Sequence, residues 1–170
     1  MKKNNHSKKD HKKDEKKPDP VIVTHHEARR DYFVIESMEC GIVLTGAEVK
    51  SLRDAKTGLS GSFARFDKNE LYIYNFYVAP YEKANINNPK DPIHPRKLLL
   101  HRDQLDRIHD QMKQKGLALI PLKLYWNKNG IAKVELALAK GKKNFDKRSD
   151  IKKENIRRDI DRAIKNRNQR

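Results

Sequence analysis

The chain has 170 residues, of which 36% are hydrophobic, so it can form one domain of ordinary size. Its formal net charge is +16 and is unevenly distributed, since residues 140–170 alone carry 13 basic and 5 acidic residues. Such a cationic segment favours a polyanionic partner such as RNA. The single cysteine, Cys40, excludes an intramolecular disulfide and argues against a thiolate-rich zinc site.

The N-terminal region shows no sign of export. The Lys-rich start is not followed by the apolar stretch of a secretory signal, and no apolar run approaches the length that spans a membrane. We therefore expect an unprocessed, soluble protein of the cytoplasm that has no membrane partner. Residues 1–22 are predicted to be a disordered basic leader, because almost no apolar residue precedes Val21.

The next part of the chain predicts strands and one short helix. Short β-branched and aromatic runs predict strands at 32–36 and 41–45. Val49 and Leu52, spaced i, i+3, predict a helix over 48–55 whose charged residues Glu48, Lys50 and Arg53 face solvent. Lys50 and Arg53 are possible phosphate contacts. Two further strands, at 62–66 and 71–78, flank a hairpin loop.

A long loop, a second helix and a hairpin follow. Four prolines predict an irregular segment at 79–96, and a helix is predicted over 102–115, ended by Gly116. Strands at 117–126 and 131–139 flank a turn in which Asn129 and Gly130 supply the positive φ angles of a tight hairpin. Pro121 interrupts its strand and predicts an edge or a bulge there.

Six short strands with two interposed helices predict a mainly β fold. A parallel sheet would need a helix between nearly every pair of strands, so a small closed antiparallel barrel is favoured. An oligonucleotide-binding (OB) barrel over residues 23–139 is the preferred member of that class, although the pattern alone does not separate it from a small split barrel.

Residues 140–170 form a basic C-terminal tail. Ile156, Ile160 and Ile164 recur every four residues and predict an amphipathic helix. A single narrow apolar stripe on a self-repelling segment does not sustain a helix without a partner. The tail is therefore predicted to be disordered in the free protein and helical only when bound.

No catalytic motif is present in the sequence. A Gly-rich phosphate loop, a nucleophile with its base and a metal-ligand spacing are all missing, the last even around the neighbouring His25 and His26. We expect a binding protein without catalytic residues, metal or cofactor. Charge and fold alone leave open a general RNA chaperone or a ribosome-associated OB-fold protein.

Five blocks of sequence carry a resemblance to a known family. They are ARRDYF at 28–33, ECGI at 39–42, GAEVKSLR at 46–53, PRKLLL at 95–100 and AKGKKNFDKR at 139–148. In this order they resemble small protein B (SmpB), the SsrA-binding protein family of bacteria. The chain has His25, His26 and Glu27 where that family usually has Asn, Lys or Arg.

The resemblance implies a function in trans-translation. A six-stranded OB barrel would bind the tRNA-like domain of transfer-messenger RNA (SsrA RNA) and deliver it, with elongation factor Tu, to ribosomes stalled on messages without a stop codon. The tail would enter the vacant decoding centre of the small subunit and the mRNA channel beyond it, so that bound message excludes it.

The resemblance also assigns residues to two RNA surfaces. The contacts implied for the tRNA-like domain are Arg29, Arg30, Glu39, Arg96, Lys97, Leu99 and His101. Those implied for the ribosome are Lys140, Gly141, Lys142, Lys143, Phe145, Asp146, Lys147, Arg148, Lys152 and Lys153. From the residues alone, Arg29 and Arg30 are equally explained as solvated arginines, Glu39 as a turn residue and Leu99 as a plug beneath the following helix.

Overall fold

The computed structural model describes residues 20–84, 89–113, 116–146, 148, 150, 156, 159–160, 162 and 164. Within them the strands are β1 (Val21–Thr24), β2 (Tyr32–Ile42), β3 (Thr57–Gly58), β4 (Phe63–Asp67), β5 (Glu70–Tyr74), β6 (Tyr77–Val78), β7 (Arg96–Leu99), β8 (Leu117–Trp126) and β9 (Ala132–Gly141). The helices are α1 (His26–Asp31), α2 (Gly46–Arg53) and α3 (Arg102–Met112).

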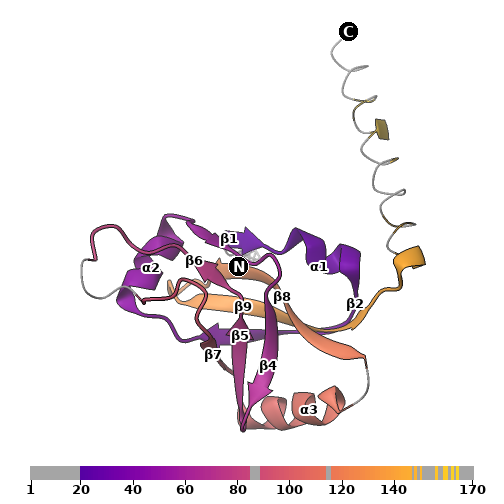
Figure 1. Cartoon of the computed structure of the whole chain (residues 1–170), viewed down its shortest axis with the longest axis horizontal. Helices are drawn as coiled ribbons and strands as arrows, with labels where there is room; N and C mark the ends of the chain where they lie inside the picture. The colour runs from indigo at the N-terminus through magenta and orange to yellow at the C-terminus, as the bar shows by residue number, and fades with distance from the viewer. Residues whose placement is uncertain are drawn as a thin grey trace, which may run out of the picture.

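Six of these strands close into a ring. The hydrogen-bonded order is β8, β4, β5, β7, β2, β9 and back to β8, and every pairing in the ring is antiparallel. This confirms the predicted mainly β, six-stranded closed antiparallel barrel, seen in Figure 1 with the short helices around it. One member differs from prediction, because the sixth strand is β7 and not residues 41–45.

Strand β2 is one continuous strand where two were predicted. It runs through Gly41, which pairs with Leu99 of β7 on one side and with Lys133 of β9 on the other. A Cβ atom added to Gly41 would lie 3.3 Å from the Leu99 Cβ. The glycine therefore does not end the strand but allows β7 to pass closely over it.

Two turns differ from the sequence prediction in detail. Residues 71–78 do not form one strand, because Asn75, at φ +54°, separates β5 from β6. In the hairpin between β8 and β9, Gly130 alone takes a positive φ of +72°, while the Asn127 side chain accepts hydrogen bonds from the backbone N–H groups of Asn129 and Ile131. The loop thus resembles a type I turn followed by a left-handed glycine.

Sequence reasoning missed β1 and α1. Strand β1 begins inside the predicted leader and pairs with β8 next to the ring. Strand β8 pairs with β4 before Pro121 and with β1 after it, and its register with β9 shifts between Pro121 and Lys123, which confirms the predicted bulge. The buried His25 stabilises the bulge through two hydrogen bonds. Its backbone N–H donates to Leu122 O (2.8 Å), and its Nδ1 lies 2.9 Å from Pro121 O.

The core fills the barrel with aliphatic side chains. Fully buried members from different strands include Leu71, Leu98, Leu119, Val134 and Leu136. Helices α2 and α3 each add a side chain to this core, Leu52 and Ile108 respectively. Burying such aliphatic side chains contributes roughly 1.5–3 kcal/mol each.

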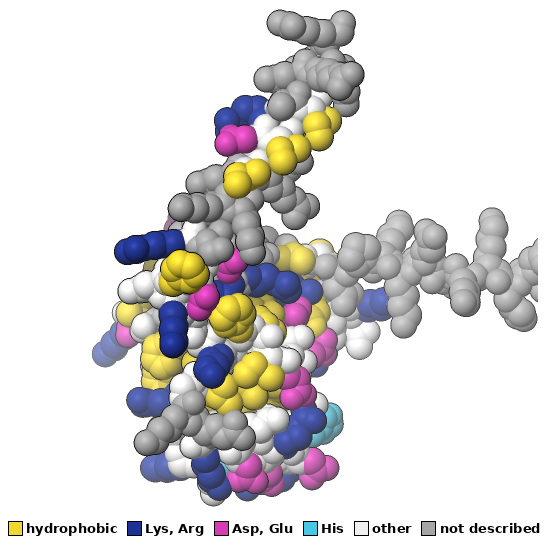
Figure 2. Space-filling view, turned by 90° about the vertical axis from the view of Figure 1, so that its right-hand side faces the viewer, with side chains coloured by type: hydrophobic (Ala, Val, Ile, Leu, Met, Phe, Trp, Pro, Cys, Tyr) yellow, Lys and Arg dark blue, Asp and Glu magenta, His cyan; other side chains and the backbone are white. Residues whose placement is uncertain are grey.

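Strand β9 continues to Gly141, so it includes the first two residues of the predicted tail. The tail residues that the structure describes beyond it, at 144–146, 148, 150, 156, 159–160, 162 and 164, have helical backbone. Figure 2 shows hydrophobic side chains in a row along this part, and Ile156, Ile160 and Ile164 are each more than half exposed. Whether the helix forms only on binding stays a prediction.

Candidate RNA interface

The side chains of strand β7 point alternately into the molecule and toward solvent. Arg96 and Leu98 point into the molecule and are 3% and 2% exposed, whereas Lys97 and Leu99 point outward, with Leu99 49% exposed. Leu99 is therefore the leucine of its run that faces solvent, as the predicted RNA surface requires. Its contact with RNA stays a prediction.

Arg96 does not belong to that surface. Its guanidinium donates to Glu48 Oε1 (2.6 Å) and to the backbone oxygens of Phe76 (2.6 Å), Pro92 (2.9 Å) and His94 (3.1 Å). Four of its five N–H donors are thus used within the protein, and its burial keeps the group away from phosphate. The predicted RNA contact is corrected to a structural role, in which Arg96 holds the segment before β7 against α2.

Glu48 is also placed differently from prediction. It was expected on the solvent face of its helix, but it is 3% exposed, while Val49 is only half-buried. Its backbone N–H and carboxylate form a reciprocal capping box with Thr45, and its other carboxylate oxygen pairs with Arg96. A buried carboxylate needs such a partner, so the Glu48–Arg96 ion pair explains both inward-facing charges.

Three of the predicted RNA residues lie around one shallow groove. The β2–β7 groove, of about 570 Å³, is lined by Glu36, Glu39, Gly41, Leu99, His101, Arg107 and Lys133, among others. The predicted residues among these are Glu39, Leu99 and His101. They come from β2, the end of β7 and the residue before α3, so the barrel topology is what brings them together.

Glu39 lies inside strand β2, not at the predicted turn. Its carboxylate accepts a hydrogen bond from the Tyr125 hydroxyl and pairs with Lys133 Nζ at 3.0 Å. The Tyr125 hydrogen bond, then the Lys133 ammonium, lower the pKa of Glu39 below its ordinary value. An ionised, half-exposed carboxylate therefore faces the groove as a hydrogen-bond acceptor.

The charges at the groove are balanced locally. Glu36 pairs with Arg107 of α3, as Glu39 does with Lys133. Compensated carboxylates of this kind can approach a polyanion with less repulsion than free ones. Lys97 lies outside the groove lining and pairs with Glu70 on the neighbouring strand β5.

Sequence reasoning missed Tyr125 and Lys133 as neighbours of Glu39. Both lie on the last two strands, where Lys123, Lys133 and Glu135 alternate with buried residues such as Leu124 and Val134, and Tyr125 is itself buried. The alternation was visible in the sequence. The pairing of β9 with β2, which sets Lys133 beside Glu39, was not.

Arg29 and Arg30 are exposed on α1, where sequence reasoning placed no helix. Arg30 pairs with Asp31 at 3.2 Å. They do not line the β2–β7 groove.

The root of the tail is attached to α1 through Lys142. Lys142 Nζ donates to Arg29 O (2.8 Å), pairs with Asp150 (2.7 Å) and lies 4.7 Å from the centre of the Phe33 ring. Only 8% of its side chain is exposed. This differs from the predicted ribosomal contact, because in this structure the ammonium group is used within the protein.

The remaining tail residues divide into two groups. Lys140 and Gly141 belong to β9 and pair with Phe33 and Tyr32 of β2, while Lys143, Phe145 and Arg148 are exposed and Asp146 is half-buried. Phe145 has 81% of its surface exposed, which leaves its ring open to a partner. Lys147, Lys152 and Lys153 lie outside the described residues.

Two other kinds of site are missing from the described ranges. No group of three or more His, Cys, Asp and Glu residues there could hold a metal ion. No helix in the same part of the chain is both long and apolar enough to cross a membrane.

Fold and surface together define a class: a closed OB-type barrel with a charge-balanced groove and a cationic extension. The sequence profile of the SmpB protein family matches residues 22–166. The chain belongs to this family, which confirms the resemblance.

Known relatives match over most of their length. The SsrA-binding protein of Caldanaerobacter subterraneus subsp. tengcongensis is 48% identical over 151 residues, which are 89% of this chain and 94% of the relative. That of Thermus thermophilus is 51% identical over 140 residues, 82% of this chain and 96% of the relative. A solved structure described as "tmRNA-SmpB: a journey to the center of the bacterial ribosome" is similar with a TM-score of 0.61 and 53% identity, covering 74% of this chain and 86% of that one.

Proposed function

We propose that this protein binds transfer-messenger RNA and delivers it to stalled ribosomes for trans-translation. The observation that carries the proposal is family membership at about half identity, joined to a barrel that assembles Glu39, Leu99 and His101 at one groove. Relatives named SsrA-binding protein, and a structural neighbour whose description names tmRNA, SmpB and the bacterial ribosome, support this partner.

The β2–β7 groove is proposed to receive the tRNA-like domain. Leu99 offers an exposed apolar side chain on which a ribose or base can pack, and Glu39 offers an acceptor to a base edge or amino group. Lys97, His101, Arg29 and Arg30 remain proposed RNA contacts around it. Phosphate contacts from such residues fix orientation, while Glu39 and Leu99 supply selectivity.

The tail is proposed to enter the decoding centre and the mRNA channel. Its support is chemical: Lys143 and Arg148 are exposed cations, and the Phe145 ring is free to stack on a base. Lys140, Gly141, Asp146, Lys147, Lys152 and Lys153 belong to the same proposal. For Lys142 the ribosomal contact requires that its bonds to Arg29 and Asp150 open first.

We propose elongation factor Tu as a further partner, which the protein contacts through the aminoacylated RNA. The proposed location is the cytoplasm, where ribosomes translate. We propose no catalytic step for this chain. It would contribute to the peptide tagging that occurs on stalled ribosomes only by binding transfer-messenger RNA and positioning it there.

A competition experiment tests the partner. The protein is mixed at physiological salt with labelled transfer-messenger RNA and a growing excess of another structured RNA of equal length. The proposal predicts that the competitor fails to displace the labelled RNA, because specific contacts add to the salt-sensitive phosphate term. Displacement of the labelled RNA by an equal amount of the other RNA would support the general RNA chaperone instead.

A further inference from the structure

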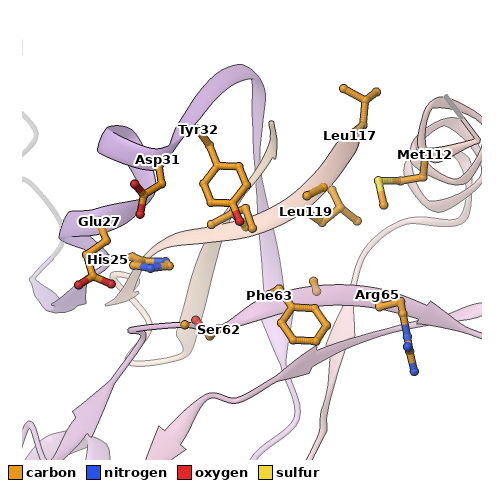
Figure 3. Close-up of a pocket in the computed structure, with 14 residues that line it drawn as sticks. His25, Glu27, Asp31, Tyr32, Ser62, Phe63, Arg65, Met112, Leu117 and Leu119 are labelled. Carbon is orange, nitrogen blue, oxygen red and sulfur yellow. The ribbon is translucent and has the colours of Figure 1, made fainter. Parts of the chain in front are cut away.

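A second cavity lies away from the β2–β7 groove, between α1, β4 and β8. It has a volume of about 420 Å³, and none of its lining residues lines the groove. Figure 3 shows the Tyr32 and Phe63 rings on opposite sides of it, with His25 and Glu27 toward one end and Arg65 toward the other. The space exceeds that of one planar aromatic ligand and falls in the usual range for small-ligand sites, roughly 300–1,000 Å³.

The walls suit a flat ring. Phe63 is held in place by stacking on Tyr74, with ring centroids 5.5 Å apart and planes inclined by 13°. Leu119 and Ile120 of β8 add an apolar lining. Tyr32 and Phe63 thus supply two aromatic rings to the lining, and aromatic side chains are the groups that bind unstacked nucleobases.

The His25 end of the cavity carries carboxylate acceptors. The Pro121 carbonyl can only accept, so His25 Nδ1 donates the proton in their 2.9 Å hydrogen bond. Glu27 accepts one bond from Ser60 Oγ (2.9 Å), and a carboxylate has capacity for more. Asp31 lies at the same end, where it pairs with Arg30. The Glu27 carboxylate disfavours phosphate and favours a ligand edge rich in N–H donors.

The opposite end carries a cation. Arg65 lines the cavity and lies over the Tyr74 ring at 5.1 Å. A nucleotide whose base enters between the rings can therefore place its phosphate toward Arg65, away from the carboxylates.

We propose that this cavity binds one unpaired guanine of an RNA. Guanine presents N1–H and the N2 amino group side by side, which a carboxylate such as Glu27 accepts in a bidentate manner. Adenine and cytosine offer only the amino group on that edge, and uracil only N3–H. The inference rests on the proposed function only in that the partner is RNA.

The test titrates the full-length, isotope-labelled chain with GMP, AMP, CMP and UMP and follows backbone amide signals by NMR. GMP is expected to shift the signals of Tyr32, Ser62 and Phe63 and to bind about tenfold more tightly than the other three, the size of one bidentate contact. Shifts of equal size with all four nucleotides, with inorganic phosphate or with spermidine would overturn the proposal.

Matched variants assign the contact. Glu27→Gln is expected to weaken GMP binding about tenfold and to leave UMP binding unchanged. Glu82→Gln is the control, since Glu82 pairs with Lys56 outside the cavity and should bind GMP like the wild type. Phe63→Leu removes one aromatic wall and should weaken all four nucleotides; if it unfolds the barrel, Glu27→Gln still decides, because Glu27 is exposed on its helix. Unchanged GMP binding by Glu27→Gln would refute the contact.

The two proposals can fail separately. Binding of transfer-messenger RNA is measured in parallel on the same samples. If the protein still prefers that RNA but GMP shifts no NMR signals, the guanine site alone is refuted. Guanine-selective shifts without any preference for transfer-messenger RNA would overturn the proposed function alone.

Discussion

The β2–β7 groove and the tail are two charged surfaces of one protein that are built in opposite ways. In the groove, strand pairing fixes Glu39, Leu99 and Lys133, and Glu39 and Glu36 have basic partners. Beyond Lys142, the described tail residues Lys143, Phe145 and Arg148 are exposed. The groove is preorganised for a shaped partner, whereas the tail offers charge and one ring to whatever surface orders it.

Removal of the tail should have the largest effect on function, because it separates the role of the tail from that of the groove. A chain ending after Lys143 keeps β9 and its pairing with β2 but loses every residue beyond Lys143. We expect tagging on stalled ribosomes to be abolished while affinity for transfer-messenger RNA stays within about threefold, because the groove is intact. Tagging assays and gel shifts measure the two quantities. Full tagging by the shortened chain would contradict the division of labour.

Breaking the Glu48–Arg96 pair should have the largest effect on stability. Arg96→Met leaves the buried Glu48 carboxylate without its guanidinium partner, so the free energy of unfolding should fall by about 3–5 kcal/mol. Lys97→Met, one residue away in a largely exposed pair with Glu70, should cost less than about 1 kcal/mol. Urea denaturation compares them. Weakened RNA binding by a fully stable Arg96→Met would restore Arg96 to the RNA surface.

Loss of one groove side chain should act on RNA binding alone. Leu99→Ala is expected to weaken binding of the tRNA-like domain about tenfold with little change in stability, since Leu99 is half exposed. Ile131→Ala is the control, because Ile131 is similarly exposed but does not line the groove. Gel shifts and thermal unfolding distinguish the effects, and equal losses from both variants would argue against a specific contact.

The smallest expected effect is the pH dependence of the contribution that Glu39 makes to stability. The pKa of Glu39 is lowered in the folded state, so its contribution to stability is present above the ordinary value of 4.5 and is lost as pH falls through the folded pKa. The difference in urea midpoint between wild type and Glu39→Gln should therefore shrink as pH is lowered from about 7 to about 3. Tyr125→Phe, which removes the largest cause of the shift, should reduce that pH dependence. A difference that is constant with pH would contradict it.

Local features of the fold could be predicted from the chain alone. Alternation of apolar residues in 132–138, the glycine of the last hairpin and the bulge at Pro121 all follow from the chemistry of neighbouring residues. Three successive leucines cannot share one face, so at least one of them had to point outward; the family resemblance, not this pattern, singled out Leu99, which is the exposed one. The same alternation would have turned Arg96 inward with Leu98.

Which distant residues meet depends on tertiary packing. The carboxylate of Glu48 and the guanidinium of Arg96 are 48 positions apart, and both are buried only because α2 packs beside the start of β7. Glu39 acquires Tyr125 and Lys133 through barrel closure, and Lys142 acquires Arg29 and Phe33 through the pairing of β9 with β2. Local sequence sets the period of a strand, but closing a ring sets its neighbours, and burial and pKa depend on those neighbours.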